Sequence, residues 1–330
     1  MSFLFPSTTI TFEAALRDLS QGSPKARVFA AHALGEVTEA TERRRAVEAL
    51  ISALDDDRPD VRAEACGSLG ELAEPAALPH LVKRLSDGAP GVRQNAAIAL
   101  GTLGLADGFA ALVEALQTGP ADLRFQAATS LAEIDGARAY DLLVAALDDN
   151  DPQVVAAAAL ALGGVADGRA GAVLAARLDH RDPGTRFDIA YALAQLGDGA
   201  GRDTLIAALS DPERAWDAVT ALGMLGEPSD AEALGRALVS KHTPPEATVL
   251  AAGTLLRLDA TAHHDAARRV LLAGLTARKV HVRGLAIEQL GAIGGAWAVA
   301  PLEKLARSRK GSEVYEAIEA ALRAIAERAR

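Results

Sequence analysis

The sequence repeats itself at a fixed interval in its first half. Segments that begin at Pro59, Pro90 and Ala121 lie 31 residues apart and read PDVRAEACGSLGELAEPAALPHLVKRLSDGA, PGVRQNAAIALGTLGLADGFAALVEALQTGP and ADLRFQAATSLAEIDGARAYDLLVAALDDN. A period between about 20 and 50 residues is typical of stacked repeats, in which one unit cannot bury its own apolar face and needs neighbours. The repeat therefore predicts a stack of similar units.

The same unit extends over most of the chain and predicts helices. It aligns through one leucine in each copy, at Leu34, Leu69, Leu100, Leu131, Leu162, Leu193, Leu222, Leu255, Leu290 and Leu322. The position ten residues earlier is usually proline, which at the first helical position loses no hydrogen bond and presets φ. Apolar residues follow at helical spacing, as in Val61, Ala65 and Leu69, and a second apolar stripe follows in each copy. We therefore predict an all-α fold of about ten helix pairs.

Composition and charge limit the classes of function. Hydrophobic residues make up 50% of the 330 residues but aromatic residues only 4%, which favours close-packed helices over a sandwich. The single cysteine, Cys66, excludes a disulfide framework, and the absence of a secretory or membrane-spanning pattern predicts a cytoplasmic protein. The net charge of −10 disfavours general nucleic-acid binding. Residues 265–330 nevertheless hold 12 Lys and Arg against 7 Asp and Glu, a balance of +5 that leaves −15 for residues 1–264.

The repeat unit resembles a known family. Its pattern D-x-P-x-V-R-x-x-A-A-x-A-L-G-x-L-G, followed by L-V-x-A-L-x-D, is similar to the short bacterial HEAT repeat named after phycobilisome lyases. The resemblance implies a right-handed αα superhelix, in which the arginine of each V-R pair bonds an aspartate of the neighbouring loop. The matching acids are Asp56, Asp87, Asp149 and Asp211, and the arginines interpreted as this structural row are Arg27, Arg62, Arg93, Arg124, Arg186 and Arg283.

The spacing of the copies suggests how the chain is divided. We expect residues 1–22 to form an N-terminal segment and capping helix, and residues 23–330 to form one solenoid. The solenoid should be most regular over 59–211, with a candidate bend near 240–246, where Pro244 and Pro245 are adjacent, and a basic C-terminal cap over 265–330.

Enzymes that resemble this fold provide tests for catalysis. Deoxyhypusine hydroxylases hold iron with His-Glu pairs, and none of the seven histidines here precedes a glutamate. Bilin lyases share the repeat type and stay an alternative, but the sequence shows no dedicated nucleophile, because Cys66 stands at an alanine position of the apolar stripe. The neighbouring His263 and His264 point in different directions on any helix, so we predict no metal, cofactor or catalytic residue.

Three surfaces are candidates for binding a partner. Second helices are expected to line the concave face, where an alanine-rich strip would hold a peptide or helix near Ala145, Arg177 and Ala207; the alternative is that these alanines only favour helix. The full predicted concave set is Lys83, Glu114, Asp141, Ala145, Ala176, Arg177, Asp203 and Ala207. The second surface is a row of aromatic residues after the V-R position, which either anchor a partner or pack internally: Phe125, Phe187 and Trp216.

The third surface is the basic end of the chain. Its cations are expected either to be solvated or to bind an acidic partner, an anionic membrane or the acidic body of a second copy: Arg268, Arg269, Arg278, Lys279, Arg307, Arg309 and Lys310. The sequence as a whole predicts a non-enzymatic scaffold or adaptor for a protein partner, monomeric or weakly self-associating. A bilin lyase or chaperone-lyase is the alternative.

Overall fold

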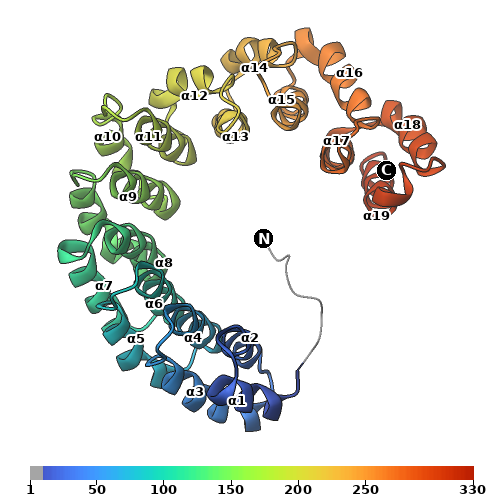
Figure 1. The fold of residues 1–330 in the computed structure, drawn as a ribbon. Helices are drawn as coiled ribbons and strands as arrows, with labels where there is room; N and C mark the ends of the chain where they lie inside the picture. Colours follow the sequence, from blue (N-terminus) through green and yellow to red (C-terminus); the bar gives the residue numbers. More distant parts are fainter. Residues whose placement is uncertain (1–9) are drawn as a thin grey trace. The chain divides into compact units, whose positions relative to one another are not determined.

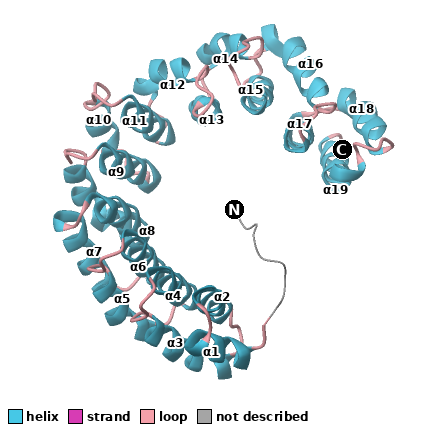
Figure 2. Cartoon of the chain, viewed as in Figure 1, coloured by secondary structure: helices cyan, strands magenta, loops and turns pink. Residues whose placement is uncertain are grey.

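The computed structural model describes residues 10–330, so the start of the predicted N-terminal segment, residues 1–9, lies outside the described residues. Every regular element in the described part of the chain is a helix (Figure 2). The chain forms two compact units, Met1–Ala170 and Gly171–Arg330, each of which is described by itself. This division lies far from residues 240–246, which belong to the second unit, and the bend expected there stays a prediction.

The helices alternate between two kinds, as the repeat predicts. First helices carry the V-R position: α2 (Pro24–Gly35), α4 (Pro59–Leu72), α6 (Pro90–Leu103), the start of α8 (Ala121–Ala146), α9 (Pro152–Val165), α11 (Pro183–Gln195), α13 (Ala215–Leu225), α15 (Pro245–Arg257), α17 (Val280–Ile293) and α19 (Tyr315–Arg328). Second helices follow them: α3 (Ala40–Ala53), α5 (Leu78–Arg84), α7 (Ala106–Thr118), the end of α8, α10 (Ala170–Ala175), α12 (Arg202–Ala208), α14 (Ala231–Ala237), α16 (His264–Gly274) and α18 (Ala296–Ala306).

Short elements complete this pattern. Helix α1 (Phe12–Gln21) precedes the first pair and packs on α2 and α3, as expected of a capping helix, and Thr11 accepts a hydrogen bond from the Ala14 N–H at its start. Single turns of 3₁₀ helix precede five helices: η1 (Pro75–Ala77), η2 (Gly199–Gly201), η3 (Pro228–Asp230), η4 (Thr261–His263) and η5 (Ser312–Val314). The described residues thus form nine pairs, with α1 before them and α19 after them.

Helix boundaries follow from local side-chain chemistry. Asp151 and Asp182 cap α9 and α11 by accepting from the backbone N–H groups of Gln153 and Thr185, at 2.9 and 2.8 Å. In α8, Asp135 leaves the helical conformation with φ −160° and ψ 88°, and its carboxylate accepts from the Arg138 N–H at 3.0 Å. This residue therefore ends the first helix of its repeat and caps the second.

First helices approach one another closely because small residues face each other. A Cβ on Gly70 would lie 2.9 Å from Cα of Ala99 on the next first helix, and one on Gly291 would lie 3.1 Å from Cα of Ala321. A real Cβ hardly ever comes so near a backbone atom, so glycine permits the packing. Second helices make few contacts with the next second helix.

This difference in spacing sets the curvature of the second unit. Taken alone, residues 171–330 curve so that α11, α13, α15 and α17 lie on the inner side and α12, α14, α16 and α18 on the outer side (Figure 1). The prediction that second helices line the concave face is therefore wrong for this unit, because the row whose backbones approach most closely becomes the shorter, inner row.

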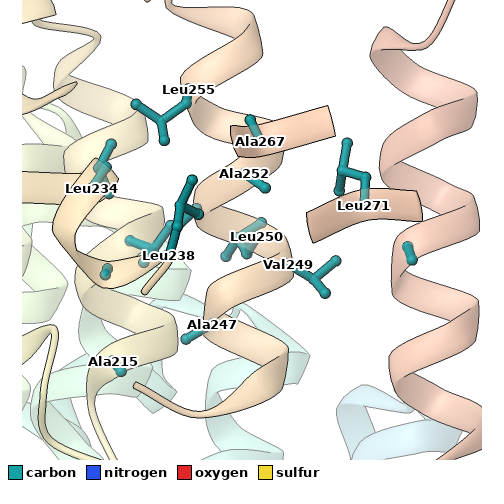
Figure 3. Close-up of a cluster of buried hydrophobic side chains, with 14 of the residues drawn as sticks. Ala215, Leu234, Leu238, Ala247, Val249, Leu250, Ala252, Leu255, Ala267 and Leu271 are labelled. Carbon is teal, nitrogen blue, oxygen red and sulfur yellow. The ribbon is translucent and has the colours of Figure 1, made fainter. Parts of the chain in front are cut away.

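Leucine and alanine fill the space between the helix rows. In the second unit one continuous cluster extends from Phe187 to Ile325, and Figure 3 shows part of it, to which Leu234, Leu255 and Leu271 belong from α14, α15 and α16. Each of these three leucines is fully buried. Burying such side chains contributes about 1.5–3 kcal/mol each, so stacking of neighbouring pairs is the main source of stability.

Candidate partner-binding site

Arginines of the V-R position join neighbouring repeats in the first unit. Arg62 donates from Nε and Nη2 to the two carboxylate oxygens of Asp87, at 2.9 and 2.7 Å, and from Nη1 to the Asp56 carbonyl at 2.9 Å. Arg124 holds Asp149 in the same way, at 2.8 and 2.7 Å. These hydrogen bonds hold the pKa of Asp87 and Asp149 below the usual value for a carboxyl. The hydrogen-bonding groups of both pairs are therefore used within the fold and are not available to a partner.

Two further arginines of the first unit pair with acids that the sequence pattern did not predict, Arg27 in addition to its predicted acid and Arg93 in place of it. Arg27 contacts the predicted Asp56, with Nε 2.9 Å from Oδ2, and also Asp57. Arg93 instead bonds Asp122 in the first turn of α8, with Nη2 2.8 Å from Oδ2. The sequence pattern did not single out Asp122, because it belongs to a helix rather than a loop.

The arginine row changes in the second unit. Within the described residues Arg186 donates to two carbonyls, those of His180 at 2.7 Å and Arg181 at 3.3 Å. The acid expected nearby, Asp211, lies 3.6 Å from Arg214 instead. Arg283, which is almost fully buried, donates to the Ala277 carbonyl at 2.9 Å and to the Glu313 carboxylate. Side chains at this position in α13 and α15, Ala215 and Thr248, have no charge.

The predicted aromatic residues divide between packing and exposure. Phe187 is buried, with its ring centroid 6.5 Å from that of Tyr191 and the Arg214 guanidinium 5.6 Å from its centroid. Phe125 and Trp216 are 37% and 40% exposed. Trp216 belongs to α13, in the inner row of the second unit. Tryptophan is among the residue types most enriched in binding hot spots.

Two aspartates accompany Trp216. Burial raises the pKa of Asp188 to about 6; Arg214 opposes this shift, whereas Asp182 and Asp217 add to it. Burial also raises the pKa of Asp217 and of Tyr191, and the charge of Asp217 adds to the shift of Tyr191. We name Asp188 and Tyr191 of α11 together with Trp216 and Asp217 of α13 the acidic–aromatic face.

The repeat position of Asp188 is bonded to the preceding first helix in two repeats of the first unit. This position lies two residues after the V-R arginine. Its occupants in α4 and α6 reach the preceding first helix: Glu64 contacts His32 at 3.0 Å, and Asn95 donates to the Ala63 carbonyl at 2.9 Å. The carboxylates of Asp188 and Asp217 form neither a hydrogen bond nor an ion pair with any described residue. The Asp188 carboxylate is half-buried without a bonded partner, which is an unfavourable state unless another molecule supplies one, whereas Asp217 is exposed.

The alanine-rich set predicted on the second helices is mostly exposed but lies on the wrong side in the second unit. Ala176, Asp203 and Ala207 are exposed on its outer side, and half-buried Arg177 donates to the Val173 carbonyl at 3.1 Å. The remaining members lie on second helices of the first unit, where all are exposed: Lys83, Glu114, Asp141 and Ala145.

The predicted basic residues gather on α16, α18 and the turns after them. Some are engaged: the Arg268 guanidinium lies 5.2 Å from the Trp297 ring centroid, Lys279 Nζ lies 3.2 Å from Glu246, and Arg307 Nη2 lies 3.8 Å from Glu303. Lys310 donates to the Thr276 carbonyl at 3.0 Å. Arg269, Arg278 and Arg309 are exposed, and their guanidinium groups form no hydrogen bond or ion pair with a described residue.

A second set of arginine contacts joins neighbouring second helices, and the sequence analysis missed it. The Arg138 guanidinium lies 3.9 Å from the Phe109 ring centroid, and that of Arg169 lies 4.1 Å from the Tyr140 centroid. Arg202 Nε lies 2.8 Å from the fully buried Asp230, whose pKa burial raises. An aromatic residue and an arginine 29 residues apart, slightly less than one repeat, were the signal that could have revealed the first two contacts.

The lone thiol and the histidines show no catalytic arrangement among residues 10–330. Cys66 is fully buried, and burial raises its pKa to about 12, so the reactive thiolate is suppressed at neutral pH. No three His, Cys, Asp or Glu side chains of the described residues gather as metal ligands. Among the same residues, no helix combines the length and apolar character needed to cross a bilayer.

Comparison with known proteins identifies the family. A model described as HEAT repeats matches residues 12–101, 78–163, 106–194 and 171–252. These overlapping matches cover well over half of the chain, which therefore belongs to the HEAT-repeat family, as the V-R pattern predicts. The match is consistent with the phycobilisome-lyase-like type of this repeat.

Solved structures share the fold. Importin beta is similar with a TM-score of 0.55 at 13% identity, over 96% of this chain and 52% of that chain, which shows the fold alone. An engineered protein is similar at 23% identity over 95% of this chain and 98% of that chain, with a TM-score of 0.42. The complex of CpcE and CpcF of phycocyanin lyase from Nostoc sp. PCC7120 is similar at 25% identity over 82% and 97%, with a TM-score of 0.40. No curated protein gives a significant sequence match.

Proposed function

We propose that the chain is a non-enzymatic protein-interaction scaffold whose partner binds the acidic–aromatic face of α11 and α13. HEAT repeats typically bind protein partners along their helix rows, which supports the general part of this proposal. The observation that carries the specific part is that Asp188 and Asp217, on the two helices of this face with the exposed Trp216, have no ion pair with a described residue, although Arg214 acts on Asp188 at longer range.

The chemistry of this face selects the partner. A lysine or arginine would pair with the two carboxylates, and its aliphatic stem would cover the indole of Trp216, where a cation–π contact adds about 0.5–2 kcal/mol. Because the Asp188 carboxylate is already partly desolvated, less of its pairing energy is lost when the partner excludes water. A basic peptide or an amphipathic helix with basic residues on one side fits this face.

Fluorescence of Trp216 provides a direct test. Replacing the other tryptophan by Trp297→Phe keeps a ring beside Arg268 and leaves Trp216 as the sole indole. Titration with an amphipathic peptide that carries arginine on one face should shift the Trp216 emission, and Asp188→Asn should weaken binding at least fivefold.

A matched pair of substitutions separates the two candidate surfaces. Ala176→Glu with Ala207→Glu alters the outer row and should leave this binding unchanged. If Asp188→Asn leaves the affinity intact while the alanine substitutions abolish it, the partner binds the second helices and the proposal is wrong.

A further inference from the structure

Three successive turns in the second unit form a basic edge, which we define by Lys241, Arg278 and Arg309. These residues lie in the turns that follow α14, α16 and α18, and all three side chains are exposed. Contacts join the turns in order: Lys279 and His281 both approach Glu246 at the start of α15, at 3.2 and 2.6 Å, and Lys310 donates to the Thr276 carbonyl. The three cations therefore follow one edge of the stack.

None of the three cations takes part in holding the fold. The backbone carbonyls of Arg278 and Arg309 accept hydrogen bonds from Arg283 and Ser312, but the charged side chains of all three residues form neither a hydrogen bond nor an ion pair with any described residue. The neighbouring Lys310 reaches only a carbonyl, so its positive charge is not neutralised either. The edge thus carries positive charge that internal packing does not require.

In the last of the three turns, the repeat register shows that a cation replaces an acid. Arg309 lies six residues before the V-R position of its repeat, where the first unit has Asp56, Asp87 and Asp149. Each of those aspartates receives an arginine of a V-R position, Arg27, Arg62 or Arg124. At the last junction Arg283 pairs with Glu313 instead, so the turn position does not need an acid to pair with an arginine. A cation at this position repels an arginine of the V-R row, whereas an aspartate there pairs with it. The presence of a cation therefore points to an external anion.

We propose that the basic edge binds an extended acidic segment of a protein partner. Neighbouring helices in a stack lie about 8–10 Å apart, so three turns span roughly 20 Å. An extended chain rises about 3.3 Å per residue, so a segment of about seven residues with carboxylates on alternate positions reaches all three turns. Val239, which is 80% exposed in the first of these turns, offers one apolar contact beside the charges.

Other anionic partners fit the edge less well. A membrane surface requires a broad apolar face beside the cations. Among the described residues of these three turns, Val239 is the only large hydrophobic residue that is exposed to this extent. A nucleic acid meets the field of the whole molecule, which carries −10, and gains most from a wide basic surface rather than three aligned side chains. This surface is separate from the acidic–aromatic face and has the opposite charge, so the two would recruit different partners.

Fluorescence anisotropy of a labelled (Glu-Ser)₄ peptide tests the inference. The peptide should bind the full chain at 50 mM salt, and affinity should fall at least tenfold at 300 mM salt because the charges are exposed. The triple variant Lys241→Glu, Arg278→Glu and Arg309→Glu should bind at least tenfold more weakly. Because these side chains are exposed, its urea unfolding curve should match that of the wild type.

A charge-matched control tests whether the position of the cations matters. Arg17→Glu, Arg44→Glu and Arg58→Glu change the net charge by the same amount at exposed sites of the first unit. This control should retain most of the affinity, and Trp216→Ala should retain all of it. Equal losses in the two triple variants would overturn the proposal, as would tighter binding of duplex DNA or phosphatidylserine vesicles than of the peptide through the same three cations.

Discussion

The two units of the chain share the same repeat but differ in how their charged side chains are paired. In the first unit the acids at repeat junctions are neutralised by bidentate arginines, as in Arg62–Asp87 and Arg124–Asp149. In the second unit three of the arginine positions are Ala215, Thr248 and Tyr315, against one, Val155, in the first, and Asp188 has no ion pair with a described residue. Charges that are paired inside a fold stabilise it, whereas charges left unpaired at its surface are available for other molecules. The difference suggests that the first unit is specialised for rigidity and the second for binding.

The largest effect is expected from breaking a junction in the first unit. Arg62→Ala removes both arginine hydrogen bonds from the Asp87 carboxylate, whose side chain is 6% exposed, and leaves it only Arg84 at 3.6 Å. Removing one partner of a buried pair costs about 3–5 kcal/mol, and we expect about 3 kcal/mol in equilibrium urea unfolding because the pair is partly solvated. The pKa of Asp87 is lowered in the folded state, so this contribution is complete at neutral pH and is lost as pH falls below about 4.

The same substitution in the second unit is the control. Arg186→Ala removes bonds to two carbonyls but leaves no buried carboxylate, so we expect a loss of about 1 kcal/mol. Equal losses for the two variants would mean that the units do not differ in the way described here.

A smaller effect is expected from the glycines that allow first helices to approach. Gly70→Ala places a Cβ 2.9 Å from Cα of Ala99 and should destabilise the first unit by about 2 kcal/mol. Gly67 lies in the same helix with no atom within 4 Å of a Cβ, so Gly67→Ala should stabilise by about 0.5–1 kcal/mol. Urea unfolding of both variants measures the contrast, and a Gly70→Ala variant as stable as Gly67→Ala would rule out backbone contact as the reason for the glycine.

Much of the fold could be predicted from the sequence because the same pattern recurs in most repeats. Proline at helix starts, the aligned leucine and the V-R pattern each follow from local chemistry, and the structure places them in helices as expected. The face of the stack that becomes concave could not be predicted in this way. In the second unit it depends on how closely first helices approach, as Gly291 approaches Ala321, relative to the spacing of the second helices, which no single repeat reveals.

The candidate site was harder to predict for a similar reason. Trp216 stood out as an aromatic residue at an unusual position, but its exposure, and the burial of the aligned Phe187, depend on neighbouring helices. Asp188 and Asp217 gave no signal, since acids on helix surfaces are common. Their significance emerges only when Glu64 and Asn95, at the same repeat position, are seen to be bonded to the preceding helix.

The pH dependence of stability of Asp188→Asn tests the central claim most directly. The pKa of Asp188 is raised to about 6 in the folded state from about 3.9 in an unfolded chain, so its ionisation destabilises the fold increasingly as pH rises from about 4 to 6. After allowance for partial exposure, urea unfolding at pH 7.5 should show Asp188→Asn to be more stable than the wild type by on the order of 1 kcal/mol, with no difference at pH 4. A variant that is less stable at pH 7.5, or equally altered at both pH values, would show that Asp188 is paired within the fold and is not held free for a partner.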